Sequence, residues 1–207
     1  MANPIKLYAN FARTSSSDKK MNVETLDART FSPEAAQAIG QLLSVVWPNP
    51  KKNADYRTQQ LIERGRAYSG PDIHAPRSLV VRENGQYIAH AAIVPRVIGT
   101  SGGELTVAGL AQVCSDPVHR GRGLGEMVVR AVFELVDAGD FPCSLFQTSH
   151  QVRPFYEKLG SCVIENKIVN SLGEDVEANP FWDKVVMRYP ATGEWPGGEI
   201  DLRGPGY

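Results

Sequence analysis

The residues best placed to bind a ligand in this 207-residue chain are six in a row, Arg120-Gly121-Arg122-Gly123-Leu124-Gly125. They follow an apolar stretch at residues 105–113 and open a segment with helical periodicity. A glycine-rich turn between a strand and a helix leaves several backbone N–H groups unpaired, and the helix dipole makes that point positive. The two arginines add charge. This segment therefore predicts an anion site, and in particular a site for a phosphate-bearing ligand.

Two common phosphate-binding motifs do not fit this turn. The dinucleotide fingerprint needs the spacing G-x-G-x-x-G, whereas these glycines stand at positions 121, 123 and 125. The nucleotide P-loop ends in Gly-Lys-Ser/Thr, whereas Glu126 follows Gly125 here. A glycine-rich loop that binds nothing is the remaining alternative, and the density of glycine and arginine speaks against it.

Composition limits the classes of protein to consider. A chain of this length with 42% hydrophobic residues fits one α/β domain, expected over residues 21–207 after a flexible lead-in at 1–20. The formal net charge of −1 gives no footprint for nucleic acid, and no apolar run approaches the ~20 residues of a membrane span. The first 20 residues lack the apolar core of a signal peptide.

The cysteines favour a reducing compartment. Cys114, Cys143 and Cys162 are three in number, so they cannot all pair within one chain. Because they also lack metal-ligand spacing, we expect no metal site and a cytoplasmic protein.

The elements that would position the turn follow from periodicity and turn residues. Asn84-Gly85 separates two apolar runs and predicts a hairpin. Ser32-Pro33 predicts the start of a helix, with Ser32 as its N-cap. The sequence predicts strands at 23–28, 78–82, 87–94, 104–113, 143–148, 162–170 and 183–189, and helices at 33–46, 54–66, 124–138 and 154–159. The strand–helix–strand passage over residues 104–148 implies a right-handed parallel crossover.

Two segments resemble a known family. Residues 113–125 resemble the acyl-CoA-binding signature of the GNAT acyltransferase superfamily, whose core Arg/Gln-x-x-Gly-x-Gly/Ala is met by Arg120, Gly123 and Gly125. Residues 153–160 resemble the Phe-Tyr-Glu-Lys-Leu-Gly segment that follows the fifth strand in that superfamily. The two matches stand in the family's order, and the resemblance covers about residues 78–170.

The resemblance implies a mixed, largely antiparallel sheet of 6–7 strands flanked by about four helices, with parallel strands 4 and 5 splayed apart. Acetyl-CoA or another acyl-CoA would be the co-substrate. Its pantetheine arm would pair with the freed backbone of the fourth strand, as an added strand would, and its diphosphate would sit on the glycine turn. The implied cofactor-binding residues are Val113, Cys114, Ser115, Arg120, Gly121, Arg122, Gly123, Leu124, Gly125 and Ser149.

The resemblance also implies that Tyr156 is the catalytic proton donor to the departing thiolate, although packing in the core is an alternative for this side chain. The general base stays open between His90, which is flanked by apolar residues, Glu104, His150 and a water relay to a carboxylate. Cys114 lies near the expected thioester path, and we interpret it as a buried, unreactive thiol.

The last 37 residues bear on the acceptor. Residues 171–207 contain seven Asp or Glu and three Lys or Arg, so they could attract a cationic amine, or could be a solvated acidic tail. Residues 195–205 resemble the C-terminal end of the nodulation N-acyltransferases, and the aminoglycoside 2'-N-acetyltransferases have a related region. Both act on amino sugars. Trp47, Tyr56 and Tyr68 could stack on a sugar ring or pack in the core.

The sequence thus predicts an enzyme that transfers an acyl group, with acetyl favoured, from acyl-CoA to a primary amine of a small polar acceptor such as an amino sugar, by direct attack. Two alternatives remain: a long-chain N-acyltransferase that uses acyl carrier protein, and a non-catalytic acyl-CoA sensor. The identity of the acceptor, the acyl-chain length, the base and the choice between monomer and homodimer stay open.

Overall fold

A computed structural model describes residues 21–207, and the predicted lead-in at 1–20 lies outside that range. The α-helices are α1 (Pro33–Val46), α2 (Ala54–Ala67), α3 (Leu124–Asp137) and α4 (Arg153–Lys158). The strands are β1 (Val23–Asp27), β2 (Arg77–Glu83), β3 (Gln86–Thr100), β4 (Gly103–Ser115), β5 (Ser144–Thr148), β6 (Cys162–Val163), β7 (Ile168–Val169), β8 (Val185–Tyr189) and β9 (Ile200–Asp201). Short 3-10 turns lie at Ala28–Thr30, Asp72–His74 and Pro117–His119.

In this part of the chain the strands form one sheet in the order β1-β2-β3-β4-β5-β8-β6, with β9 pairing both β3 and β7. Every pair on the main path is antiparallel except β4–β5, which is parallel, as the crossover through α3 requires. Six strands have five residues or more, and the other three have two each. The predicted fold class is confirmed.

Local signals account for several of these boundaries. Ser32 Oγ accepts a hydrogen bond from the N–H of Ala35 at 3.1 Å, so the predicted N-cap of α1 is confirmed. The β2–β3 hairpin turns at Asn84 and Gly85, both with positive φ, as a two-residue turn of this kind demands. One prediction is wrong: residues 162–170 form two separate short strands, because β6 pairs with β8 whereas β7 pairs with β9.

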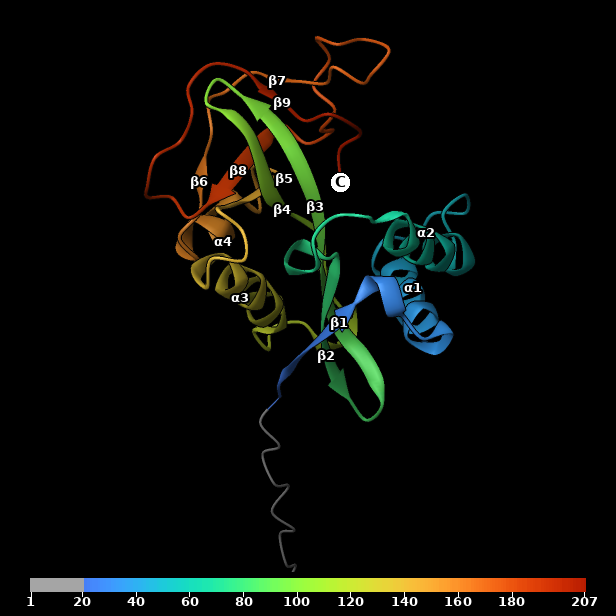
Figure 1. The fold of residues 1–207 in the computed structure, drawn as a ribbon. Coiled ribbons are helices and arrows are strands. Elements are labelled where there is room, and N and C mark those ends of the chain that lie inside the picture. The colour runs from blue at the N-terminus through green and yellow to red at the C-terminus, as the bar shows by residue number, and fades with distance from the viewer. Residues whose placement is uncertain (1–20) are drawn as a thin grey trace, which may run out of the picture.

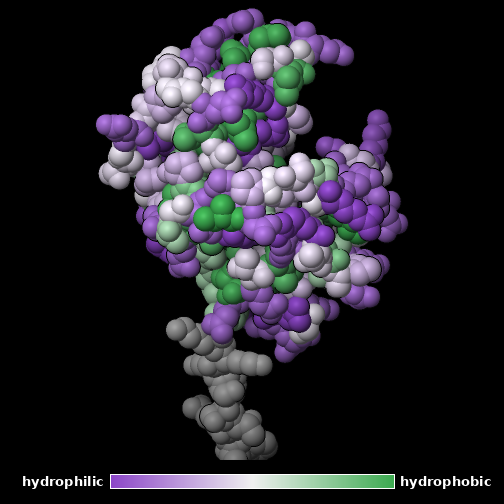
Figure 2. Space-filling model, viewed as in Figure 1, coloured by the Kyte–Doolittle hydropathy of each residue, from purple (hydrophilic) through white to green (hydrophobic). Residues whose placement is uncertain are grey.

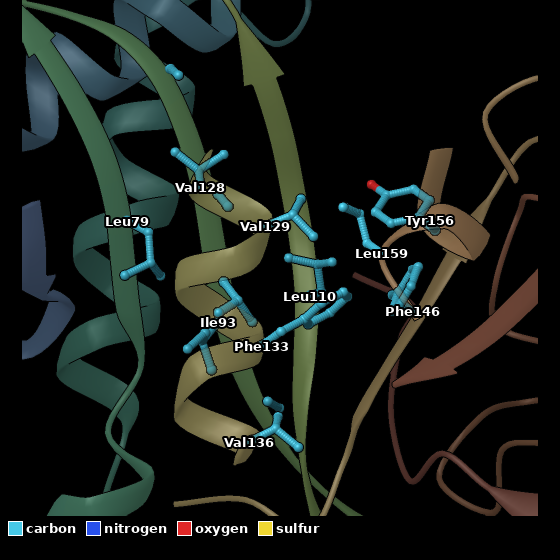
Figure 3. Packing of buried hydrophobic residues seen from close by; sticks show 14 of the residues in the cluster. Leu79, Ile93, Leu110, Val128, Val129, Phe133, Val136, Phe146, Tyr156 and Leu159 are labelled. Carbon is cyan, nitrogen blue, oxygen red and sulfur yellow. The ribbon is translucent and has the colours of Figure 1, made fainter. Parts of the chain in front are cut away.

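Helices cover both faces of the sheet, with α3 and α4 on one side and α1 and α2 on the other (Figure 1). The apolar stripe of α3 packs on strands β2, β3 and β4, where its side chains meet Leu79, Ile93 and Leu110 (Figure 3). A second apolar cluster joins α1 to the opposite face through Ile39, Leu43 and other residues. Among residues 21–207, no helix is both long and apolar enough to cross a membrane.

Candidate acyl-transfer site

Strands β4 and β5 separate soon after they meet. Their parallel pairing covers two residue pairs only, Ala108 with Ser144 and Gly109 with Leu145. Beyond that point β4 runs on to Ser115 without a partner on this side, while β5 pairs with β8 on its other side. The predicted splay is therefore confirmed, and the backbone groups that β4 turns toward β5 beyond Gly109 are left without strand partners.

A bulge distorts β4 just beyond the branch point. The β3–β4 register shifts between His90 and Ala92, and Gln112 on β4 has a φ of 53°, a strained value for a residue with a side chain. The imidazole of His90 supports this bulge, because its Nδ1–H donates to the Gln112 carbonyl at 3.1 Å while its Nε2 lies 2.9 Å from Ser78 Oγ. Burial lowers the pKa of His90 to about 4. A neutral, buried His90 fits a structural role rather than the general base.

The splay opens into a cavity of about 860 Å³. Its walls come from the end of α1 and the loop after it, from one face of α2, from the free part of β4, from the end of β5 and the turn into α4, and from the last segment of the chain. The lining residues are Val46, Trp47, Pro48, Asn49, Lys52, Arg57, Gln60, Arg64, Leu110, Ala111, Gln112, Val113, Gln147, Thr148, Ser149, Val152, Tyr156, Trp182, Asp183, Gly206 and Tyr207. Val113, Ser149 and Tyr156 are thus brought together around one space.

Tyr156 is both packed and accessible from the cavity. It is 6% exposed, its ring lies 4.7 Å from that of Phe146, and it sits beside Leu159 at the edge of the core cluster (Figure 3). The two interpretations of this side chain are therefore compatible. Burial raises the pKa of the Tyr156 phenol above its usual value, so the hydroxyl keeps its proton at neutral pH. A protonated phenol at the cavity wall can donate to a negatively charged sulfur.

Neither His150 nor Glu104, the two other residues considered as the general base, lies at this cavity. His150 is exposed and is absent from the lining, and Glu104 pairs with Arg203 at the far end of β4. Among the described residues the one carboxylate that lines the cavity is Asp183, whose backbone N–H donates to Gln147 Oε1 at 2.8 Å. Sequence reasoning missed Asp183 because its only signal was a position at the start of an expected strand.

The glycine turn has the geometry of an anion site. Gly121 and Gly123 have φ of 78° and 74°, and a Cβ added at either would meet no atom within 4 Å. No backbone N–H from Gly121 to Gly123 donates to another described residue, and no side chain caps α3. Arg122 is engaged by Glu83 at 2.7 Å, so it contributes less free charge than the sequence suggested. Arg120 has no ion pair within residues 21–207.

Cys114 is not positioned for chemistry. Its side chain is 6% exposed and packs with Leu43, Val80 and Tyr87 in the cluster under α1. Burial raises the pKa of its thiol to about 12. The interpretation as an unreactive thiol therefore agrees with the structure, and only the backbone at this position can serve a ligand.

The C-terminal region meets the cavity differently from what its composition suggested. Of the seven acidic residues in 171–207, only Asp183 lines the cavity, while Glu177 and Glu199 pair with Lys167. Trp195 lies in a second hollow, where its Nε1–H donates to Asn166 Oδ1 at 2.7 Å. Apart from Asp183, the acidic residues of this region therefore lie outside the cavity.

The aromatic residues at the cavity also differ from those expected. Trp47 lines it, as the sequence suggested, but Tyr56 and Tyr68 do not. A second tryptophan, Trp182, also lines the cavity; it is 71% exposed and was not singled out from the sequence.

Comparison with known proteins identifies this arrangement. Residues 27–163 match the family model described as an acetyltransferase (GNAT) domain, which is more than half of the chain. The chain belongs to the GNAT acetyltransferase family. The family model describes an acetyltransferase domain, which is the activity expected of this chain. No curated protein matches the chain.

Solved structures share the GNAT fold. A GNAT family N-acetyltransferase from Escherichia coli, in complex with CoA, aligns with a TM-score of 0.58 at 14% identity, over 90% of this chain and 92% of that one. An acetyltransferase from Trypanosoma brucei aligns with a TM-score of 0.53 at 21% identity, over 70% and 95%. The chain spans only 33% of a GCN5-related N-acetyltransferase from Kribbella flavida, with a TM-score of 0.52 at 20% identity over 69% of this chain. The family model matches residues 27–163, so it does not reach residues 195–205, which resemble the nodulation and aminoglycoside acyltransferases.

Proposed function

We propose that this GNAT enzyme transfers an acetyl group from acetyl-CoA to the primary amine of a small polar acceptor, by direct attack of the amine on the thioester. The observation that carries the proposal is the cavity at the splay of β4 and β5, which holds Tyr156 on one wall and Asp183 on another. A space of about 860 Å³ suits a small molecule rather than a protein surface.

Acetyl-CoA would reach this cavity from the α3 side. The N–H groups from Gly121 to Gly123, which donate to no other residue of 21–207, would bind its diphosphate, and Arg120, which has no ion pair in that range, would add positive charge. The pantetheine arm would run along the unpartnered edge of β4 at Val113–Ser115, since its amides can replace the missing strand. Ser149, which caps the turn into α4 through its carbonyl, would contact the arm where it enters the cavity.

The chain supplies the proton transfers. The amine nitrogen bonds to the thioester carbon, the C–S bond breaks, and Tyr156 donates its phenolic proton to the sulfur. Asp183 accepts the proton that the amine loses, directly or through one water molecule. No acyl-cysteine intermediate is needed, because the Cys114 thiol points into the core and burial raises its pKa to about 12.

An amino sugar is the acceptor that the aromatic residues favour. Trp47 is 40% exposed and Trp182 is 71% exposed, and both line the cavity, so either ring could stack on a sugar face. The similarity of residues 195–205 to acyltransferases of amino sugars supports the same class. So does a structural neighbour of this fold, a glucosamine-6-phosphate N-acetyltransferase from Arabidopsis thaliana.

A coenzyme-release assay tests the proposal. Acetyl-CoA is offered with amino sugars, aminoglycosides, polyamines, amino acids and a lysine peptide, and we expect turnover with small amines and not with the peptide. Tyr156→Phe should lower kcat by about a hundredfold or more while CoA affinity, measured by calorimetry, holds. Phe155→Leu, which alters the neighbouring packing but no proton donor, is the control. Absence of turnover with every amine would instead indicate the acyl-CoA sensor.

A further inference from the structure

The wall of the cavity formed by α2 carries an excess of positive charge. Among the side chains of residues 21–207 that line the cavity, three are cationic, Lys52, Arg57 and Arg64, and one is a carboxylate, Asp183. Such a wall repels a protonated amine, so attraction of the amine alone does not account for it. The charge therefore points to a second chemical group on the acceptor.

The cations share one helix face. Arg57, Gln60 and Arg64 are spaced i, i+3 and i+7 on α2, so they form one stripe along the helix. The neighbouring face of α2, about 100° round the helix from this stripe, is packed closely on the protein: a Cβ at Gly65 would lie 1.9 Å from the Ala28 carbonyl oxygen. This close contact leaves α2 little freedom to rotate, so the stripe is held toward the cavity. Hydrophilic residues dominate the α2 side of the molecule in Figure 2.

Arg64 has no counter-charge in the described part of the chain. Its guanidinium makes neither an ion pair nor a hydrogen bond with any residue of 21–207. Burial and the neighbouring charge of Arg96 lower its pKa. The guanidinium of Arg96 donates to the carbonyl oxygens of Arg203 and Pro205, and no carboxylate of residues 21–207 neutralises its charge. A partly buried cation beside another cation is costly unless an anion joins it.

Two further groups complete the wall. Arg57 donates to the backbone oxygens of Trp47 at 2.7 Å and Lys52 at 2.9 Å, so it is fixed in place while its charge is not neutralised. Gln112 Oε1 is buried without a hydrogen-bond partner among the described residues, and Gln112 lines the same cavity. Because an amide oxygen accepts hydrogen bonds, a hydroxyl or amine N–H of the acceptor would satisfy Gln112, while its anionic group would lie on the guanidinium groups.

We infer that the acceptor carries a negatively charged group, a carboxylate or a phosphate, in addition to its amine, and that Arg64 and Arg57 bind this group on the α2 wall. Asp183 then holds the amine on the other side of the cavity. The inference rests on the proposed function. The anion is not the coenzyme diphosphate, because the turn that would bind it belongs to α3 on the opposite face of the sheet and does not line this cavity (Figure 1).

Matched acceptors test the inference in the coenzyme-release assay. Glucosamine is compared with glucosamine 6-phosphate, and an amino acid with its methyl ester. We expect kcat/KM to be higher for the anionic member of at least one pair, and that pair identifies phosphate or carboxylate. Arg64→Gln should reduce this preference by about 10-fold to 100-fold, chiefly through KM, and Arg64→Lys should restore part of it. Arg66→Gln, an exposed arginine of the same helix outside the cavity lining, is the matched control.

The outcomes separate the two proposals. Turnover with no preference for the anionic member, or a preference that Arg64→Gln leaves intact, would overturn the anion site while the acyltransferase function stood. If succinyl-CoA were used in place of acetyl-CoA, and Arg64→Gln affected only that donor, the anion would belong to the acyl group and the inference would fail. If no amine turned over, calorimetry would measure the binding of glucosamine 6-phosphate and of the amino acid to the CoA-loaded protein. Binding that Arg64→Gln weakens would support the anion site. No binding, or equal binding to the parent protein and the variant, would overturn it.

Discussion

Gly109 is the last residue of β4 that pairs with β5, and a tyrosine ring fills the space beside it. A Cβ at Gly109 would lie 2.6 Å from the nearest ring carbon of Tyr207 and 2.4 Å from the Val94 carbonyl oxygen. The Tyr207 hydroxyl donates to the carbonyl of Leu145, the residue that pairs with Gly109, at 2.9 Å. Tyr207 thus occupies the branch point of the splay and satisfies a β5 carbonyl there. Gly109→Ala should disrupt this branch point.

The expected cost follows from two parts. Overpacking by one methyl group costs about 1–3 kcal/mol, and an unpaired Leu145 carbonyl costs about 1–3 kcal/mol more when the Tyr207 ring is displaced. We therefore expect Gly109→Ala to lower the free energy of unfolding by about 4 kcal/mol, a drop in Tm of about 8–16 °C for a domain of this size. Tyr207→Phe removes the hydroxyl alone and should cost only about 1–3 kcal/mol.

Thermal unfolding followed by circular dichroism measures these changes, together with a double-mutant cycle. Because the ring is one of the two obstacles, Gly109→Ala should cost at least about 1 kcal/mol less in a Tyr207→Ala background. Gly125→Ala is the control, since its Cβ would meet nothing within 4 Å and its φ is not positive. An equal cost of Gly109→Ala in both backgrounds would refute the role of Tyr207 at the branch point.

Three further predictions concern other parts of the chain. Gly123→Glu should weaken CoA binding by on the order of a hundredfold in calorimetry, because it places a negative charge at the turn. Gly193→Glu should not, although it changes a loop glycine that also has a positive φ, of 88°, and open space beside it. Equal CoA affinities of the two variants would locate the diphosphate elsewhere. The free energy of unfolding should fall as the pH falls from 6.5 toward about 4, because in this window His90 takes up a proton in the unfolded chain but not in the folded one. The loss due to His90 is about 3 kcal/mol, and urea unfolding of His90→Gln as a function of pH should lack it. A thiol reagent should label Cys162 first in the native protein, because the other two cysteines are buried, and simultaneous labelling of all three would contradict the packing.

The sequence by itself determined the elements that local chemistry dictates. The apolar spacing of α3, the Ser32 cap and the Asn84-Gly85 turn each involve neighbours within a few residues, so their signals survive without tertiary context. The same holds for the glycine turn, because its positive φ values and its free N–H groups are properties of six consecutive residues. The family resemblance rests on these local patterns, and so does the proposed coenzyme half of the site.

Only the tertiary structure points to the proposed acceptor half of the site. Arg64 and Asp183 stand 119 positions apart in the sequence and face one cavity because β4 and β5 diverge and the end of the chain folds back beneath them. Neither residue belongs to a motif. The charge of Arg64 points to a ligand only because the fold places no counter-charge beside it within residues 21–207. The composition of residues 171–207 was compatible with an acidic surface that attracts a cationic amine. In the fold, however, several of those carboxylates pair with Lys167 and Arg203, and the α2 wall of the cavity carries positive charge. Net charge is a sum over residues, but the field in a cavity depends on which of them face it.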